Sequence, residues 1–279
     1  MMPVQLVPIV GTDPNLTGVP FGMDYMPPNL INGPQNFVFI QDPLTELSQC
    51  SGAIIRQEVE LLEALTGCET QNRYHVFLQS PMGLKYAFKC SERSEGCARC
   101  CLSPECRPLQ IIVRHIISLD QLSGDFAKIF VSVDKPCQCG CCCLCRPYMD
   151  VRLTESNRGL GRIVQPCTCC DLDAEIYDPV GNLKYEIRGD CCQVGLCGSH
   201  TIEKMSTIRF DILQNRNIVG VIRKLSSSLG EFFTKADSYQ VSFPPHATPE
   251  DKMLFILAGL MIDYQYFEKN DSDSSSYHY

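Results

Sequence analysis

The sequence has little positive charge, and its first residues do not have the pattern of a secretory signal. It carries 24 Lys and Arg residues against 32 Asp and Glu residues, which gives a formal net charge of −8. A nucleic-acid-binding domain would present a basic patch, and a polybasic lipid-binding segment would cluster Lys and Arg, so neither class is expected. The first ten residues contain no cationic region and no long apolar core, and we therefore expect no secretory signal.

The sequence also lacks the patterns of common enzyme and nucleotide-binding sites. No glycine-rich phosphate loop follows a predicted strand. The five histidines are scattered, and none forms the spacing of a metal site or a catalytic triad. We therefore expect a protein that is not an enzyme.

Proline and glycine divide the chain into a domain and two tails. Residues 1–36 contain seven prolines and four glycines without apolar periodicity, which is typical of a disordered segment. Residues 37–268 carry the patterning of one folded domain. Residues 269–279 form an acidic, serine-rich segment that we also expect to be disordered.

Most of the domain alternates apolar and polar residues, which is the period of a β-strand. Ile54–Leu65 fits one face of a helix, although its first residues fit a strand equally well. Because no helices separate the strands, we predict a mostly β fold: a closed antiparallel barrel of about 12 strands, whose closure removes the exposed edges. The predicted strands are Phe37–Ile40, Arg73–Gln79, Leu84–Lys89, Leu109–Ile116, Phe126–Val133, Tyr148–Leu153, Gly161–Gln165, Leu172–Asp178, Leu183–Arg188, Ser206–Leu213, Ile218–Lys224 and Asp237–Phe243.

The most apolar segment is Met253–Ile262, near the C-terminus. Thr248–Asp251 supplies the cap, the first-turn proline and the early carboxylates of a helix start. A helix without a polar face must be surrounded by protein or by lipid. Ten helical residues span about 15 Å, against about 30 Å of bilayer hydrocarbon, and extension to Phe267 would put Asp263 in the membrane. We therefore predict that this helix fills the barrel, with a single-pass span over residues 253–267 as the alternative.

The chain has 19 cysteines, and without a secretory signal we expect no disulfide framework. Six of them lie within nine residues and form what we call the cysteine cluster. On an extended backbone the five odd-numbered members would share one face. The cluster consists of Cys137, Cys139, Cys141, Cys142, Cys143 and Cys145.

Three interpretations of the cysteine cluster are open. Its C-x-x-C spacings, Cys139/Cys142 and Cys142/Cys145, could contribute to a zinc thiolate site. Further ligands would come from Cys167, Cys170, Cys191, Cys192 and Cys197, although there is no clean pair of knuckles with a fixed spacer. Clustered thiols in a reducing compartment could instead carry acyl chains, several of which give stable anchoring. Free cysteines can also be buried as small hydrophobic residues, which suits Cys50 and Cys68 better than so dense a run.

Several motifs keep their order and spacing from about Leu47 to Phe267. Besides the cysteine cluster they are Glu58–Glu69, Gly189 and Cys191 with Cys197, Glu231–Pro244 and Leu257–Glu268. In these motifs the chain resembles the phospholipid scramblase family. The resemblance implies a tubby-like fold, a barrel of twelve strands around a C-terminal helix. It also implies a protein that moves phospholipids in both directions between plasma-membrane leaflets, in response to calcium and without ATP.

The resemblance further implies that the cysteine cluster is palmitoylated. The protein would then be a lipoprotein on the cytoplasmic face of the plasma membrane, with the phospholipid membrane as its partner. The box of the family places cysteines at Cys137, Cys141, Cys142 and Cys145. At the position where the family's cysteine box has a proline, this sequence has Cys143. Further cysteines of the box are replaced here by Gly140 and Leu144.

The calcium motif of the family is altered in this sequence. Its first acidic position is Lys235 and its last is His246, and only Asp237 keeps a carboxylate, with Ser238 as a weak oxygen donor. A lysine ammonium repels a dication in a site that needs oxygen ligands. We therefore expect weak or absent Ca²⁺ binding at Asp237. Another function remains open, that of a Zn²⁺-stabilised adaptor of the same fold without lipid transport.

Overall fold

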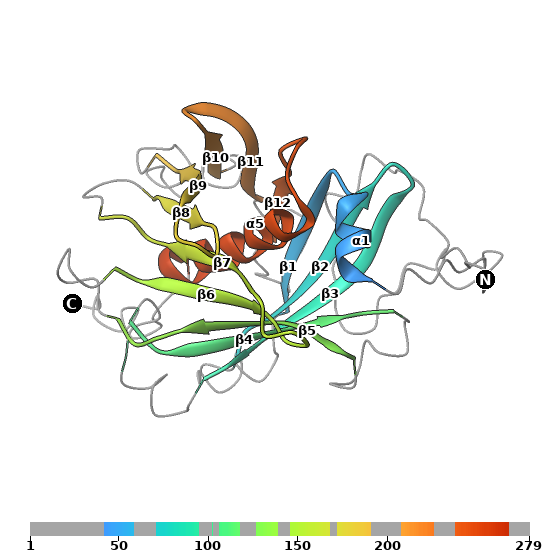
Figure 1. The fold of residues 1–279 in the computed structure, drawn as a ribbon, viewed down its shortest axis with the longest axis horizontal. Helices are drawn as coiled ribbons and strands as arrows, with labels where there is room; N and C mark the ends of the chain where they lie inside the picture. The colour runs from blue at the N-terminus through green and yellow to red at the C-terminus, as the bar shows by residue number, and fades with distance from the viewer. Residues whose placement is uncertain are drawn as a thin grey trace, which may run out of the picture.

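A closed antiparallel barrel dominates the computed structural model, which describes residues 42–58, 71–94, 102, 106–117, 127–138, 146–167, 172–190, 208–225 and 238–267. Each strand pairs with its neighbours in sequence, and the first strand pairs with the last (Figure 1). The strands are β1 (Gly52–Glu58), β2 (Arg73–Ser80), β3 (Gly83–Arg93), β4 (Leu109–His115), β5 (Ile129–Lys135), β6 (Tyr148–Leu153), β7 (Gly159–Val164), β8 (Ala174–Tyr177), β9 (Leu183–Arg188), β10 (Ile208–Gln214), β11 (Asn217–Leu225) and β12 (Ser238–Ser242).

The predicted barrel is confirmed, and eleven of its strands lie where the alternation of apolar residues placed them. The remaining strand differs from the prediction. Phe37–Ile40 lies outside the described residues. The first residues of Ile54–Leu65, which fitted a helix and a strand equally well, belong to β1. Its backbone is extended because it pairs with β12 on one side and β2 on the other, which closes the barrel.

The predicted apolar helix runs through the inside of the barrel (Figure 1). It is α5 (Pro249–Ile262), followed by the π-helix η4 (Asp263–Phe267). Thr248 and Asp251 form a capping box: the Thr248 hydroxyl accepts from the Asp251 N–H at 3.2 Å, and the Asp251 carboxylate accepts from the Thr248 N–H at 3.1 Å. Every residue from Asp251 to Ile262 is buried, so the prediction that this helix fills the barrel is confirmed. Within the described residues, no helix has the length and apolar character to cross a membrane.

A short helix that the sequence analysis missed, α1 (Pro43–Ser48), packs beside the start of α5. Asp42 caps it by accepting from the backbone N–H groups of Leu44 and Thr45. Lys252 of α5 is buried, and its ammonium donates to three carbonyls at the C-terminal end of α1. They are the carbonyls of Leu47 at 3.0 Å, Ser48 at 3.0 Å and Cys50 at 2.8 Å. These bonds satisfy carbonyls that a helix end leaves unpaired, and they tie α1 to α5.

The two ends of the barrel differ. One end, which we call the turn end, carries the tight hairpins at residues 81–82, 154–158, 178–182 and 215–216 and the start of α5. Asn215 and Arg216 there both have positive φ, 51° and 67°, as a two-residue hairpin requires. The other end, the loop end, is where β1, β3, β5, β7, β9 and β11 finish and where α5 passes into η4.

Candidate functional site

The barrel topology places nearly all of the cysteines in segments that begin and finish at the loop end. These segments connect β1 to β2, β3 to β4, β5 to β6, β7 to β8 and β9 to β10. Every cysteine of the chain except Cys50 and Cys90 belongs to one of them. The described ends of all five cysteine-bearing segments therefore lie at the same end of the barrel. The loop end is the candidate functional site.

The described cysteines have different surroundings. Cys137, the first residue of the cysteine cluster, is exposed, and Cys106 is half-buried. Burial raises the pKa of Cys50 to about 11 and that of Cys90 to about 12, so both stay protonated and suit the interpretation as small hydrophobic residues. The other members of the cluster, residues 139–145, lie outside the described residues.

Cys167 differs from the expectation that the cysteines are free. It is disulfide-bonded, whereas the other four described cysteines are thiols. Its partner is none of those four and therefore lies outside the described residues. Cys167 follows β7 at the loop end.

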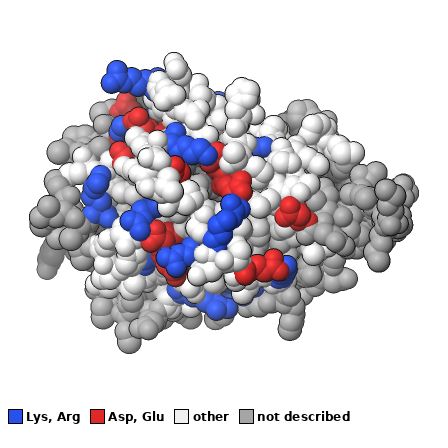
Figure 2. Space-filling model, in the orientation of Figure 1, with Lys and Arg blue, Asp and Glu red and all other residues white. Residues whose placement is uncertain are grey.

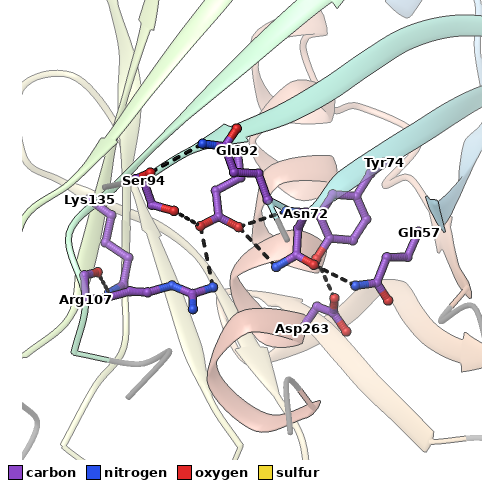
Figure 3. A network of polar contacts seen from close by, with 9 residues as sticks. Gln57, Asn72, Tyr74, Glu92, Ser94, Arg107, Lys135 and Asp263 are labelled. Atoms are coloured by element: carbon purple, nitrogen blue, oxygen red, sulfur yellow. Dashed lines mark hydrogen bonds and ion pairs between the residues drawn. The ribbon is translucent and has the colours of Figure 1, made fainter. Parts of the chain in front are cut away.

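Two buried cations hold the segments that carry Cys106 and Cys137 (Figure 3). Arg107 is fully buried and its guanidinium lies 3.5 Å from the Glu92 carboxylate. The Lys135 ammonium donates to the Arg107 carbonyl at 2.8 Å. Next to them, the Gln138 N–H donates to the Cys106 carbonyl at 3.2 Å. The residues that follow β5 and those that precede β4 are therefore held next to each other.

The partner of Arg107, Glu92, is itself fully hydrogen-bonded (Figure 3). One carboxylate oxygen accepts from the Ser94 hydroxyl at 2.6 Å, and the other accepts from the Asn72 backbone and side-chain N–H groups, both at 3.1 Å. A buried ion pair stabilises a fold only when its remaining donors and acceptors are satisfied. This network meets that condition at the carboxylate and makes the base of the loop end rigid.

The end of α5 is fixed in the barrel by Asp263, which the sequence analysis singled out as too polar for a membrane. Its side chain is buried, and it accepts hydrogen bonds from the hydroxyls of Tyr74 and Tyr239, both at 2.6 Å. These tyrosines are the second residues of β2 and β12. Charge-assisted hydrogen bonds of this length compensate the burial of a carboxylate. The polar residue thus marks the point where the helix reaches the loop end.

Only part of the calcium motif lies among the described residues. Asp237 and Lys235 lie outside the described residues, but Ser238–Ser242 form β12 in the barrel wall. The two ends of β12 are about 13 Å apart at about 3.3 Å per residue. In the sequence, Lys235 precedes the end of β12 at the loop end, whereas His246 follows its other end, at the turn end. Ser238 stands directly opposite Arg56 of β1, and cross-strand partners share a face. A cationic neighbour is unfavourable for calcium.

Charges of both signs are mixed on the outer wall. Figure 2 shows Lys and Arg interspersed with Asp and Glu on the face it presents. Cross-strand and neighbouring pairs account for much of this pattern, such as Arg162 with Asp150 at 2.7 Å and Arg209 with Asp211 at 2.6 Å. That face offers no single-sign area of the kind that draws a protein to anionic lipid.

The residues of the proposed zinc site are largely outside the described part of the chain. Of the cysteines considered for it, only Cys167 is described, and it is disulfide-bonded. Among the described residues, no group of three His, Cys, Asp or Glu side chains has the arrangement of a metal site.

A twelve-stranded closed barrel around a C-terminal helix is a tubby-like architecture, and the loop end with its cysteines is its distinctive part. The chain belongs to the scramblase family, whose model matches residues 33–269. It is 27% identical to human phospholipid scramblase 1 over 90% of this chain and 72% of that protein. It is 26% identical to phospholipid scramblase 2 of Bos taurus, over 95% of this chain and 82% of that protein. No solved structure is significantly similar to the chain.

Proposed function

We propose that this protein is a phospholipid scramblase that moves lipids in both directions between the leaflets of the plasma membrane without ATP. The observation that carries the proposal is the family match, which extends over the whole barrel rather than over one motif. The names of the relatives at about 25% identity point to the same activity. No bond is made or broken, so the protein is not an enzyme in this proposal.

Vesicles with a fluorescent lipid test the transport. A membrane-impermeant reductant bleaches only the outer-leaflet lipid, so protein that exchanges the leaflets makes the inner-leaflet lipid bleachable as well. The expected result is faster and more complete bleaching than in protein-free vesicles. Equal bleaching in the two preparations would contradict the transport.

The membrane anchor in this proposal is palmitate on the cysteine cluster, which holds the protein on the cytoplasmic face. Three features support it: the cysteine-bearing segments start from one end of the barrel, Cys137 is exposed, and the buried Lys135 and Arg107 fix the base of that end. Several acyl chains at one end give durable attachment where one chain does not. An anchor there keeps the apolar helix α5 free to be the core of the barrel.

Labelling with a palmitate analogue tests the anchor. The wild-type chain is expected to incorporate label and to sediment with membranes. A variant with Cys141→Ala, Cys142→Ala and Cys145→Ala is expected to lose most of both signals. Cys50→Ala, which changes a buried cysteine at the turn end, is the matched control and keeps the label. An unlabelled wild type, or equal label in the triple variant, rules the anchor out.

Calcium is not required in this proposal. Ser238 lies opposite Arg56, and β12 separates the two ends of the motif, so Asp237 alone is left to bind the ion. Titration calorimetry with Ca²⁺ is expected to give no saturable heat in the micromolar range, and Asp237→Asn is expected to change nothing. Saturable binding that this substitution removes would show that the site is intact.

A zinc-stabilised adaptor is the second candidate function, and the gathering of the cysteines at one end is the observation that favours it. Thiolates from several loops can surround one tetrahedral ion without any lipid being attached. Elemental analysis of protein purified without added metal separates the two functions. About one zinc per chain would support the adaptor function. A metal-free protein would rule out the adaptor function and leave the scramblase function as the remaining candidate.

A further inference from the structure

A pocket of about 440 Å³ lies at the loop end, where β3 and β5 finish and β4 and β6 begin. This volume is in the range of small-molecule sites, about 300–1,000 Å³. Its walls combine apolar surface with charges of both signs. The residues that matter for the argument are Arg93, Pro108, Leu109, Asp134, Tyr148 and Asp150.

The strand register arranges the polar side chains of this pocket in one row. Arg93 of β3 stands opposite Gln110 of β4, Gln110 stands opposite Asp134 of β5, and Asp134 stands opposite Asp150 of β6. Arg162 of β7 is the next member of the row, outside the pocket. Cross-strand partners face the same way, so these charges are neighbours on one surface.

Two members of the row have no charged partner among the described residues. Asp150 is satisfied, because Arg162 donates to both of its oxygens at 2.7 and 3.0 Å. Asp134 receives one neutral hydrogen bond at 3.0 Å from Gln110, and it directly faces the like charge of Asp150. Arg93 is exposed and makes no ion pair in the described part of the chain. The pocket thus offers one cation and one carboxylate to a ligand.

These two charges suit a zwitterion. Arg93 and Asp134 are separated by two strand spacings, about 10 Å between their Cα atoms, with Gln110 between them in the row, and both side chains line the pocket. We propose that this pocket binds the amine-bearing headgroup of a phospholipid, with its phosphate on Arg93 and its ammonium on Asp134. The proposal rests on the function proposed above and names the lipid class that the barrel recognises.

The chemistry favours a primary ammonium over a quaternary one. A carboxylate with unused acceptor sites binds N–H donors, which a quaternary ammonium lacks. Quaternary ammonium groups are bound on aromatic faces. The one ring in the pocket wall, Tyr148, already has the Arg162 guanidinium 4.2 Å from its centroid. An ethanolamine or serine headgroup therefore fits better than a choline headgroup.

The pocket also lies where a lipid would be found. Lys135 and Pro136 line it, and the exposed Cys137 follows them directly. If the cysteine cluster carries the membrane anchor, the pocket is held at the lipid headgroups. Its position and its charges thus point to the same ligand.

Binding of soluble headgroup analogues to the full chain tests the proposal. Titration calorimetry is expected to show that glycerophosphoethanolamine binds at least tenfold more tightly than glycerophosphocholine or inorganic phosphate. Arg93→Gln and Asp134→Asn are each expected to weaken this binding at least tenfold. Arg152→Gln removes an exposed arginine of β6 outside the pocket and is the matched control, which binds as the wild type does.

Three results would overturn the proposal. They are an absence of binding to glycerophosphoethanolamine, equal binding of inorganic phosphate, which would indicate a simple anion site, and wild-type affinity in both pocket variants. All substituted side chains are exposed, and a circular dichroism spectrum matching the wild type shows that each variant is folded. Leaflet exchange is measured separately. Exchange without headgroup binding refutes the pocket alone, and headgroup binding without exchange refutes the transport.

Discussion

Individual cysteines of this protein differ sharply in reactivity because their surroundings differ. The thiol pKa of Cys90 is raised to about 12 and that of Cys50 to about 11, whereas Cys137 is exposed. Only the thiolate reacts with alkylating reagents. At pH 8, iodoacetamide is therefore expected to modify Cys137 and to leave Cys50 and Cys90 unmodified until the protein is denatured.

Peptide mass spectrometry of native and denatured samples measures this difference. The denatured sample is the control, because there all three thiols are accessible. Modification of Cys90 at the rate of Cys137 in the native protein would show that the interior of the barrel is open to solvent.

Glu46 gives the fold a dependence on acid pH. Burial by itself raises the pKa of its carboxyl, but the hydrogen bond with His115 and the charge of Lys85 outweigh burial, so the pKa is below the ordinary value of 4.5. A carboxyl whose pKa is lower in the folded state stabilises the fold above its unfolded pKa. This contribution is lost as the pH falls through the folded pKa.

The free energy of unfolding is therefore expected to fall below about pH 4.5, and Glu46→Gln is expected to remove part of this decline. Urea denaturation at a series of pH values measures it. Glu155→Gln changes an exposed carboxylate, 77% accessible, and serves as the control that keeps the wild-type profile. An acid decline in Glu46→Gln as steep as in the wild type would contradict the assignment.

The sequence predicted some residues of the loop end and missed others. The cysteine cluster and Asp263 stood out because their composition is unusual for their position. Arg107 and Lys135 did not, because an isolated charged residue in a strand or loop is normally exposed. Arg107 pairs with Glu92 of β3 and Lys135 donates to the Arg107 carbonyl, and the barrel brings these residues together.

Among the elements, β7 is tightly packed at Gly161, between β8 and α5. A Cβ atom at this position would lie 2.4 Å from the Tyr177 carbonyl oxygen and 2.9 Å from a Leu254 methyl group. Because a backbone atom cannot move aside as a side chain can, Gly161→Ala is expected to lower the free energy of unfolding by about 2 kcal/mol.

Gly159, in the same strand, provides the control for this prediction. Its nearest neighbour would be a Pro179 atom at 3.8 Å, an ordinary contact. Gly159→Ala is therefore expected to change the free energy of unfolding by less than about 0.5 kcal/mol. Chemical denaturation of both variants measures the difference. Equal values for the two would mean that a side chain at Gly161 finds room beside Tyr177 and Leu254.

Most elements could be predicted because their pattern is local. Alternating apolar residues and turn sequences such as Gln214–Asn217 placed eleven strands, and Thr248 with Pro249 marked the start of α5. β1 could not be assigned, since its extended form depends on strands β12 and β2 at distant positions. α1 has only six residues and lies beside α5 through contacts of Lys252, which nothing in its own sequence reveals.

The molecule as a whole has one end built from tight turns and one end that carries the cysteines. The central helix is enclosed, so its apolar residues serve the core of the barrel. The loop end then holds the proposed anchor and the proposed headgroup pocket, and both follow the same strand, β5. Lipid attachment and lipid recognition would thus take place on one side of the protein.

We propose that this barrel exchanges phospholipids between leaflets and does not need calcium to do so. The rate of leaflet exchange in vesicles containing the full chain, compared between excess chelator and excess Ca²⁺, tests this. The same rate is expected in both conditions, well above that of vesicles prepared with heat-denatured protein. A rate no higher than this control in either condition, or exchange that appears only with Ca²⁺, would contradict it.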